Sequence, residues 1–103
     1  MKIELLYFEG CPGYAALLPR LRELVAEQEG EAELLLRPVE TPEAALSDRF
    51  LGSPSVRVAG QDIEPGADDR DDFGLKCRLY RRDEGLVRTP PEQWIRAALK
   101  RAV

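Results

Sequence analysis

The stretch Phe8-Glu9-Gly10-Cys11-Pro12-Gly13-Tyr14 joins a predicted strand to a predicted helix. Residues 2–8 form a nearly continuous apolar run, which is typical of a strand covered on both faces. Pro12 suits the first helical position, because its missing N–H would be unpaired there anyway. Cys11 is therefore predicted at a helix N-terminus, where free N–H groups and the helix dipole favour the nucleophilic thiolate. We interpret Cys11 as a reactive, solvent-reachable sulfur; the alternative is a small residue that caps a tight turn.

The rest of the first half alternates helices and strands. The helix after Cys11 carries an apolar stripe, contains Pro19, which should kink it, and ends near Gly30. Residues 32–39 form a second strand, and Thr41 and Pro42 open a short helix that reaches residue 50 or 51. Residues 55–59 and 62–64 form a strand and a brief returning strand. This alternation predicts a βαβ unit with a parallel pair of strands.

The second half is more irregular. Residues 65–73 read as a polar loop, in which Asp68, Asp69, Asp71 and Asp72 form a solvated acidic cluster rather than a metal site. Residues 75–80 alternate and predict a strand with Leu75, Cys77 and Leu79 on one face. A turn at 83–85 follows, and Thr89 begins the last helix as a capping box, with Trp94 in the core. Antiparallel strands are expected in this half.

Composition excludes several functions. The chain has 103 residues, 44% hydrophobic content and a net charge of −4, which predicts one domain spanning residues 1–103. It has no basic stripe for nucleic acid and no apolar run that would span a membrane. Histidine is absent, so His-dependent catalysis and His metal sites are excluded, and no cofactor or metal is expected. Without a leader sequence, the expected compartment is the reducing cytoplasm.

The order of elements, with Cys11 at the first strand–helix junction and Ser53-Pro54 before the third strand, resembles the thioredoxin-like superfamily. Gly10-Cys11-Pro12 looks like the start of a glutaredoxin active site, and Pro19 matches a helix-kinking proline. The resemblance implies an α/β thioredoxin-like fold with a central mixed sheet of four to five strands and about three helices on its faces. It also implies a cis-proline loop at Pro54 that packs against the reactive cysteine.

A narrower resemblance involves the stretches 52–58 and 72–80. They look like a small bacterial group of thioredoxin-like proteins, the DF family, some members of which contain selenocysteine. This family lends no reaction. The broader resemblance implies a site in which Cys11 is the nucleophile and Tyr14 and Pro54 shape its surroundings. Substrate contacts would fall on four residues near that sulfur: Pro12, Gly13, Ser53 and Ser55.

The sequence departs from the redox families at Tyr14, where they place a second cysteine. The resulting Cys-Pro-Gly-Tyr motif excludes a dithiol exchange within the motif. A one-cysteine mechanism remains, in which Cys11 attacks a disulfide and a second thiol releases it from the mixed disulfide. The second thiol could be glutathione, another small thiol or Cys77.

Two interpretations of Cys77 are open. In the first, Cys77 is a core residue beside Leu75 and Leu79, because free cysteine is among the most buried residue types. In the second, the 65–73 excursion folds back over the site and brings Cys77 near Cys11 as a resolving thiol. A disulfide between them would require Cα atoms within about 7 Å.

Three functions therefore compete. The first is a thiol–disulfide oxidoreductase acting on protein or small-molecule disulfides. The second is a non-catalytic thioredoxin-fold module that binds an extended peptide beside Pro54 or a soft metal at Cys11. The third is a structural subunit of an oligomer. Arg57, Arg78 and Arg82 are either surface charges or a site for an anionic thiol such as glutathione.

Overall fold

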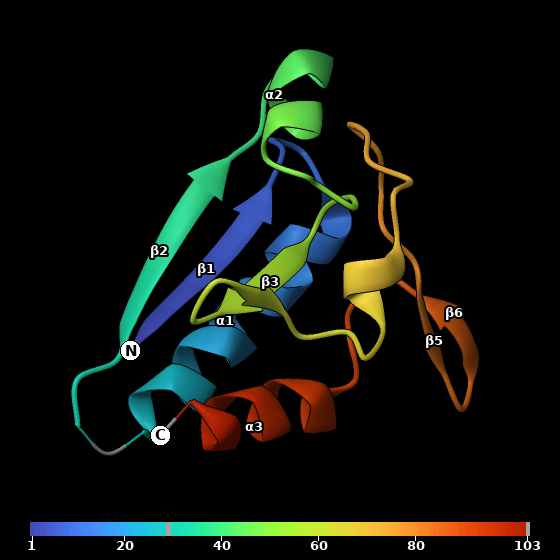
Figure 1. The fold of residues 1–103 in the computed structure, drawn as a ribbon. Coiled ribbons are helices and arrows are strands. Elements are labelled where there is room, and N and C mark those ends of the chain that lie inside the picture. Colours follow the sequence, from blue (N-terminus) through green and yellow to red (C-terminus); the bar gives the residue numbers. More distant parts are fainter. Residues whose placement is uncertain (29, 103) are drawn as a thin grey trace.

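The computed structural model describes residues 1–28 and 30–102 and confirms the mixed α/β class (Figure 1). The described residues form a four-stranded sheet, a two-stranded sheet and three α-helices. In chain order the elements are β1 (Lys2–Tyr7), α1 (Pro12–Ala26), β2 (Glu33–Pro38), α2 (Pro42–Ser47), β3 (Ser55–Val58), β4 (Gln61–Asp62), a 3₁₀ helix (Ala67–Asp69), β5 (Tyr80–Arg82), β6 (Gly85–Val87) and α3 (Glu92–Arg101). None of these helices is long and apolar enough to cross a membrane.

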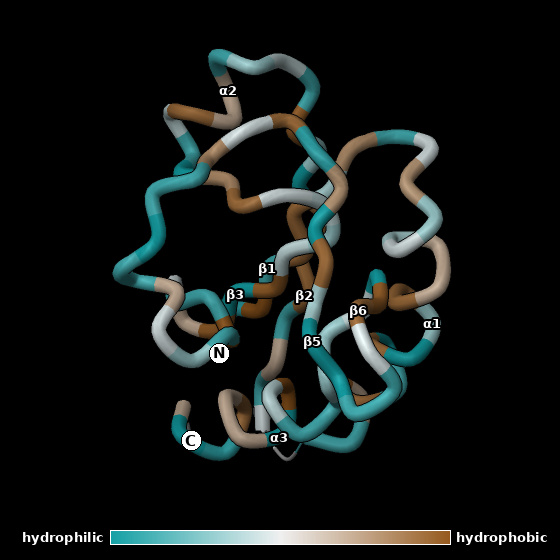
Figure 2. The backbone as a smooth tube through the Cα atoms, turned by 90° about the vertical axis from the view of Figure 1, so that its right-hand side faces the viewer, coloured by the Kyte–Doolittle hydropathy of each residue, from teal (hydrophilic) through white to brown (hydrophobic). Residues whose placement is uncertain are grey.

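The four-stranded sheet has the order β2-β1-β3-β4, with β1 inside. β1 pairs in parallel with β2 from Lys2↔Glu33 to Tyr7↔Pro38, which confirms the predicted parallel pair. On its other side β1 pairs antiparallel with β3, which in turn pairs antiparallel with β4. The inner position of β1 explains its apolar run, because both faces of an inner strand are covered. Figure 2 shows brown, hydrophobic segments gathered at β1 and β3 and teal segments on the outer loops.

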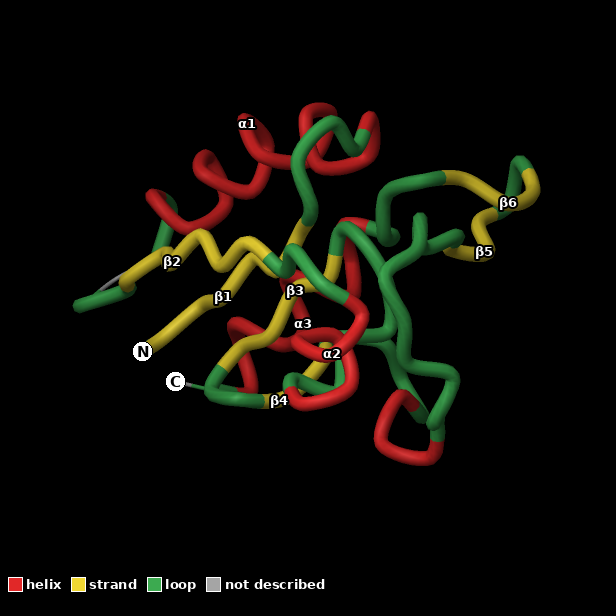
Figure 3. The backbone as a smooth tube through the Cα atoms, turned by 90° about the horizontal axis from the view of Figure 1, so that it is seen from above, coloured by secondary structure: helices red, strands yellow, loops and turns green. Residues whose placement is uncertain are grey.

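Each face of the sheet packs against its own apolar cluster. On one face, residues of β1 and β3 contact α1 and α3; the buried members are Ile3, Leu5, Leu17, Leu21, Leu24, Val56, Val58, Ile63, Ile95, Ala98 and Leu99. On the other face, Leu6 packs with Val39, Ala45 and Phe50, around α2. Figure 3, viewed from above, shows α1 on one side of the sheet and the β5–β6 hairpin away from it. Trp94 packs against the first cluster, as predicted.

The ends of the helices follow local chemistry, with two differences from expectation. Thr41 caps α2 as predicted, since its Oγ1 accepts a hydrogen bond from the N–H of Ala44 at 3.1 Å. α2 nevertheless ends at Ser47, because the chain turns there to bury Phe50. α1 contains Pro19 and ends at Ala26, before the predicted stop at Gly30.

The predicted capping box at the start of α3 is wrong. Pro91 occupies the N-cap position, and no side chain caps the helix there. The Thr89 hydroxyl instead accepts a hydrogen bond from Arg82 Nη1 at 3.4 Å. The side chain of Glu92, the other half of the expected box, forms an ion pair with Arg20 on α1. A charge-assisted pair with a guanidinium is stronger than a neutral cap, so α3 begins with an ion pair.

The predicted strand over residues 75–80 is also wrong in extent. Only Cys77 makes an isolated bridge, to Ser53, and regular strand begins at Tyr80. Leu75, Cys77 and Leu79 share an exposed face, whereas Arg78 and Tyr80 are buried. The inner face carries the aromatic ring of Tyr80 and the side chain of Arg78, whose guanidinium pairs with carboxylates. After the predicted turn at 83–85, the chain returns as β6, which the sequence did not predict.

The ion pair between α1 and α3 predicts an acid-sensitive contribution to stability. Arg20 donates to both Glu92 oxygens, at 2.9 and 2.6 Å, and Arg96 also contacts this carboxylate. Hydrogen bonds from Arg20 and then Arg96 lower the pKa of Glu92 from 4.5 to about 2. Because the folded-state pKa is lowered, the stabilisation is present above pH 4.5 and is lost as the pH falls towards 2.

We therefore expect Glu92→Gln to be less stable than the wild type at pH 7 and nearly equal to it at pH 2. Urea denaturation of both proteins at several pH values measures the difference. A gap of the same size at pH 7 and pH 2 would show that the Glu92 charge contributes nothing through this pair.

Candidate thiol site around Cys11 and Ser53

Cys11 lies where the sequence predicts it, at the N-cap of α1 with extended backbone angles (φ −72°, ψ 118°). Its S–H donates to the carbonyl oxygen of Ser53 at 3.5 Å, so the sulfur lies beside the residue that precedes Pro54. The expectation of a reachable sulfur is wrong for this conformation, because only 3% of Cys11 is exposed. The thiol is positioned at a helix N-terminus but is shielded from solvent.

The start of α1 is closely packed at Gly13. A Cβ built at Gly13 would lie 2.7 Å from the carbonyl oxygen of Arg88 and 2.9 Å from Pro54 Cδ. The first turn of α1 therefore presses against both the Pro54 loop and the chain that leaves β6. Glycine is required for this approach because the neighbours are backbone or ring atoms that cannot rotate away. Pro12, the neighbouring residue, is exposed.

The N–H, the carbonyl and the hydroxyl oxygen of Ser53 all take part in internal hydrogen bonds. Its N–H donates to the carbonyl of Lys76 at 2.8 Å, and its carbonyl accepts from the N–H of Arg78 at 2.9 Å as well as from Cys11. Its hydroxyl accepts from the N–H of Phe8 at 3.3 Å, at the start of the turn that leads to Cys11. The Ser53–Pro54 peptide bond is cis, as the resemblance implied.

A segment of the chain that we call the covering segment, residues 74–80, makes most of these contacts. It runs alongside residues 50–54, beginning with a 2.9 Å hydrogen bond from Gly74 N to Phe50 O. It continues through the Ser53 bridge and ends with the Tyr80 hydroxyl, which donates to the Pro54 carbonyl at 2.6 Å. The covering segment thus pairs with the backbone of Ser53, whose carbonyl also accepts the Cys11 S–H.

Arg78 anchors the covering segment. Its buried guanidinium donates to Asp62 at 2.7 and 3.0 Å, to Glu64 at 3.2 Å and to the Ser55 hydroxyl at 2.8 Å. It also lies 4.7 Å from the centre of the Tyr80 ring, in cation–π geometry. Burial raises the pKa of Tyr80, which keeps its hydroxyl protonated as the donor to Pro54. The interpretation of Arg78 as a free surface charge, or as a site for an anionic thiol, is therefore wrong.

Two further predicted site residues have structural contacts of their own. Tyr14 stacks on Tyr7, with ring centroids 3.8 Å apart and planes within 6°. Burial, followed by the neighbouring Tyr14, raises the pKa of Tyr7. Ser55 is buried; its hydroxyl donates to the Gly52 carbonyl at 2.5 Å and accepts from Arg78. Tyr14 therefore borders the strand–helix turn, and Ser55 supports the loop from inside.

The structure decides between the two interpretations of Cys77 in one respect. Cys77 is exposed, so the interpretation as a core residue is wrong. It is brought to the site through its bridge to Ser53, whose carbonyl also accepts from Cys11. Both cysteines are free thiols. The sequence contained the alternation of residues 75–80 but gave no sign of which face would turn inward.

The other charged candidates have local partners. Arg57 donates to the carbonyls of Asp48 and Arg49, and Arg82 pairs with Glu84. In the acidic loop, Asp72 pairs with Arg70 and Lys76, and the hydrogen bonds from Arg70 and then Lys76 lower the pKa of its carboxyl. Over residues 1–28 and 30–102 there is no group of three side chains able to hold a metal ion.

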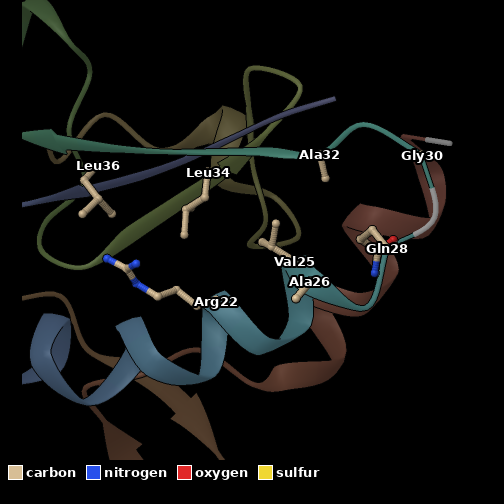
Figure 4. Close-up of a pocket in the computed structure, with 8 residues that line it drawn as sticks. All are labelled: Arg22, Val25, Ala26, Gln28, Gly30, Ala32, Leu34 and Leu36. Atoms are coloured by element: carbon tan, nitrogen blue, oxygen red, sulfur yellow. The ribbon is translucent and has the colours of Figure 1, made fainter.

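A groove of about 540 Å³ lies away from the cysteines, between α1 and β2. Figure 4 shows the aliphatic side chains of α1 and β2 facing one another across it, with Arg22 reaching towards β2. Its lining contains neither cysteine, so it offers no chemistry for a thiol reaction. Leu36 on β2, 37% exposed, forms part of this groove.

Comparisons of the chain with protein-family models, with curated proteins and with solved structures give no match.

Proposed function

We propose that this chain is a thiol–disulfide oxidoreductase of thioredoxin-like fold in which Cys11 reacts through a mixed disulfide. The observation that carries the proposal is the position of the Cys11 sulfur, at the start of the 15-residue helix α1 and 3.5 Å from the carbonyl of Ser53. Reactive cysteines occur at helix N-termini in proteins, and this sulfur also adjoins the loop at Ser53 and Pro54. The element order and the positions of Cys11 and Pro54 support the thioredoxin-like assignment.

The chemistry needs only thiols. The Cys11 thiolate attacks one sulfur of a disulfide, a new S–S bond forms, and the other sulfur leaves as a thiolate that takes up a proton. A second thiolate then attacks the mixed disulfide and releases Cys11. Tyr14 stands where redox motifs have their second cysteine. The second thiol therefore comes from a small thiol such as glutathione or from elsewhere in the chain.

The proposal is tested with bis(2-hydroxyethyl) disulfide as the oxidant and reduced glutathione as the thiol. Production of oxidised glutathione is followed through glutathione reductase and NADPH. We expect the wild type to catalyse the exchange and both Cys11→Ser and Cys11→Ala to fall to background, because neither retains a nucleophilic sulfur at this position.

The pair of variants separates chemistry from packing. Serine keeps a donor for the Ser53 carbonyl, whereas alanine does not, so a purely structural role would spare Cys11→Ser and damage Cys11→Ala. Circular dichroism melts confirm that both variants are folded. Wild-type exchange no faster than buffer, or full activity in Cys11→Ser, would overturn the proposal.

A second candidate is a non-catalytic binding module, and the 3% exposure of Cys11 favours it. In that case the thiol merely packs against the Ser53 carbonyl, and a partner binds elsewhere on the scaffold. The same assay discriminates the two functions: a binding module shows no exchange, and its Cys11→Ser variant keeps the stability of the wild type.

A further inference from the structure

We propose that Cys77 is the thiol that first reacts with the substrate disulfide, and that Cys11 then attacks the sulfur of Cys77. This inference rests on the proposed function and names the route by which a disulfide reaches the buried nucleophile. The product is a disulfide between Cys11 and Cys77 within the chain. The exposed thiol of Cys77 thus meets the substrate first, and the buried thiol of Cys11 completes the exchange.

The first step of the inference is the shared contact at Ser53. Cys77 is the bridge partner of Ser53 in a parallel pairing, in which neighbouring strands lie about 5 Å apart. The carbonyl of the same Ser53 accepts the S–H of Cys11. A single residue therefore separates the two cysteines, although they are far apart in the sequence.

The second step is the direction of the Cys77 side chain. Residues paired across a ladder project to the same face, so Cys77 and Ser53 share one face of the pairing. The Ser53 hydroxyl on this face contacts the N–H of Phe8, and Phe8 begins the turn to Cys11. On the opposite face, Arg78 Cβ lies 2.9 Å from the position that a Cβ on Gly52 would take. Cys77 therefore projects to the side on which the chain leads to Cys11.

The third step is the contrast in exposure between the two thiols. Cys11 is 3% exposed, whereas Cys77 is exposed on the covering segment. Oxidation and exchange follow the access of the attacking sulfur, so a disulfide in solution meets Cys77 first. The Arg78 ion pairs hold the neighbouring backbone, and hence Cys77, beside Ser53.

The Cys77 thiolate attacks a disulfide R–S–S–R, forms Cys77–S–S–R and releases R–S⁻, which takes up a proton. The Cys11 thiolate attacks the Cys77 sulfur, forms the Cys11–Cys77 disulfide and releases the second R–S⁻. The chain is oxidised by two electrons and the substrate is reduced to two thiols. Two molecules of a low-molecular-weight thiol restore the reduced chain and become one disulfide.

The test uses oxidised glutathione as the probe, with acid quenching, intact-mass spectrometry and peptide mapping. We expect the wild type to lose two hydrogen atoms as Cys11 and Cys77 join. We expect Cys11→Ser to accumulate one glutathione on Cys77. In Cys77→Ser, we expect glutathione to reach Cys11 about ten-fold or more slowly, because that sulfur is shielded. Since Cys77 is exposed, its replacement leaves the fold intact, which a melting curve checks.

The outcomes separate this inference from the proposed function. If Cys77→Ser takes up glutathione at Cys11 as fast as the wild type loses its thiols and still turns over, Cys11 works alone and the inference fails. If the wild type ends with glutathione on Cys77 and no internal disulfide, the inference also fails. If Cys11 stays a free thiol in every variant that contains it, the proposed function itself is overturned.

Discussion

Replacing Arg78 with methionine is expected to lower the free energy of unfolding by about 2–4 kcal/mol, the largest effect of a single charged residue that we foresee. The substitution keeps an apolar stem of similar size but removes the partner of Asp62 and Glu64, which are themselves largely buried. Asp62 and Glu64 lose their ion pairs with Arg78, and the Ser55 hydroxyl loses a donor. The value lies below the full cost of an unpaired buried charge, because Glu64 keeps its pair with Arg70.

Chemical denaturation measures the effect, and Arg96→Met is the matched control. Arg96 also makes two ion pairs, but its side chain is 51% exposed, so its loss is expected to cost less than about 1 kcal/mol. A double-mutant cycle with Asp62→Asn should show coupling, because part of the penalty comes from the abandoned carboxylate. Equal costs for Arg78→Met and Arg96→Met would contradict the anchoring role.

The same variant should open the thiol site. Arg78 holds the covering segment, so its removal is expected to raise the rate at which iodoacetamide alkylates Cys11. Unchanged alkylation in a destabilised but folded Arg78→Met protein would mean that the covering segment is not what shields the sulfur.

Gly52→Ala is the second substitution with a large expected cost, about 2–5 kcal/mol. Gly52 has a φ of +124°, a conformation that residues with a side chain rarely adopt. Its new Cβ would also lie 2.9 Å from Arg78 Cβ and 3.1 Å from the Lys76 carbonyl. Backbone strain and steric conflict therefore act together at the pairing of the Ser53 loop with the covering segment.

Gly60→Ala isolates the backbone term. Gly60 also has a positive φ, +84°, but a Cβ there meets no atom within 4 Å. Its expected cost is about 1–2 kcal/mol, measured by the same denaturation experiment. If Gly52→Ala lowers the free energy of unfolding no more than Gly60→Ala does, the covering segment can move away from the new methyl group at no energetic cost. It is then not tightly packed against the loop.

The sequence predicts the first half of the fold well because each signal there has one physical meaning. The apolar run around Ile3 and Leu5 fits only an inner strand, and its pairing with β2 and β3 confirms this. Thr41 followed by Pro42 predicts a helix start, and α2 begins there. The placement of Cys11 follows from two signals. The strand ends before Cys11 and the helix begins at Pro12, so Cys11 lies at the helix N-terminus.

The covering segment could not be predicted because both of its faces carry apolar side chains. Leu75 and Leu79 fit one inner face and Tyr80 fits the other, and a charged Arg78 is costly to bury unless its guanidinium is paired. That burial depends on Asp62 and Glu64, which lie earlier in the chain in a region read as a returning strand and loop. No local pattern announces an ion pair formed only in the folded state. The exposure of Cys77 follows from this choice of inner face.

The edge of the sheet formed by β2 has a consequence for how the molecules behave at high concentration. An edge strand can pair with a strand of a neighbouring chain, and the exposed Leu36 adds apolar surface to this one. Glu33 and Arg37 place charges along it, and Pro38 at its end has no N–H to offer a partner. These charges and the proline discourage fibre-like pairing of β2 with the same strand of a second molecule.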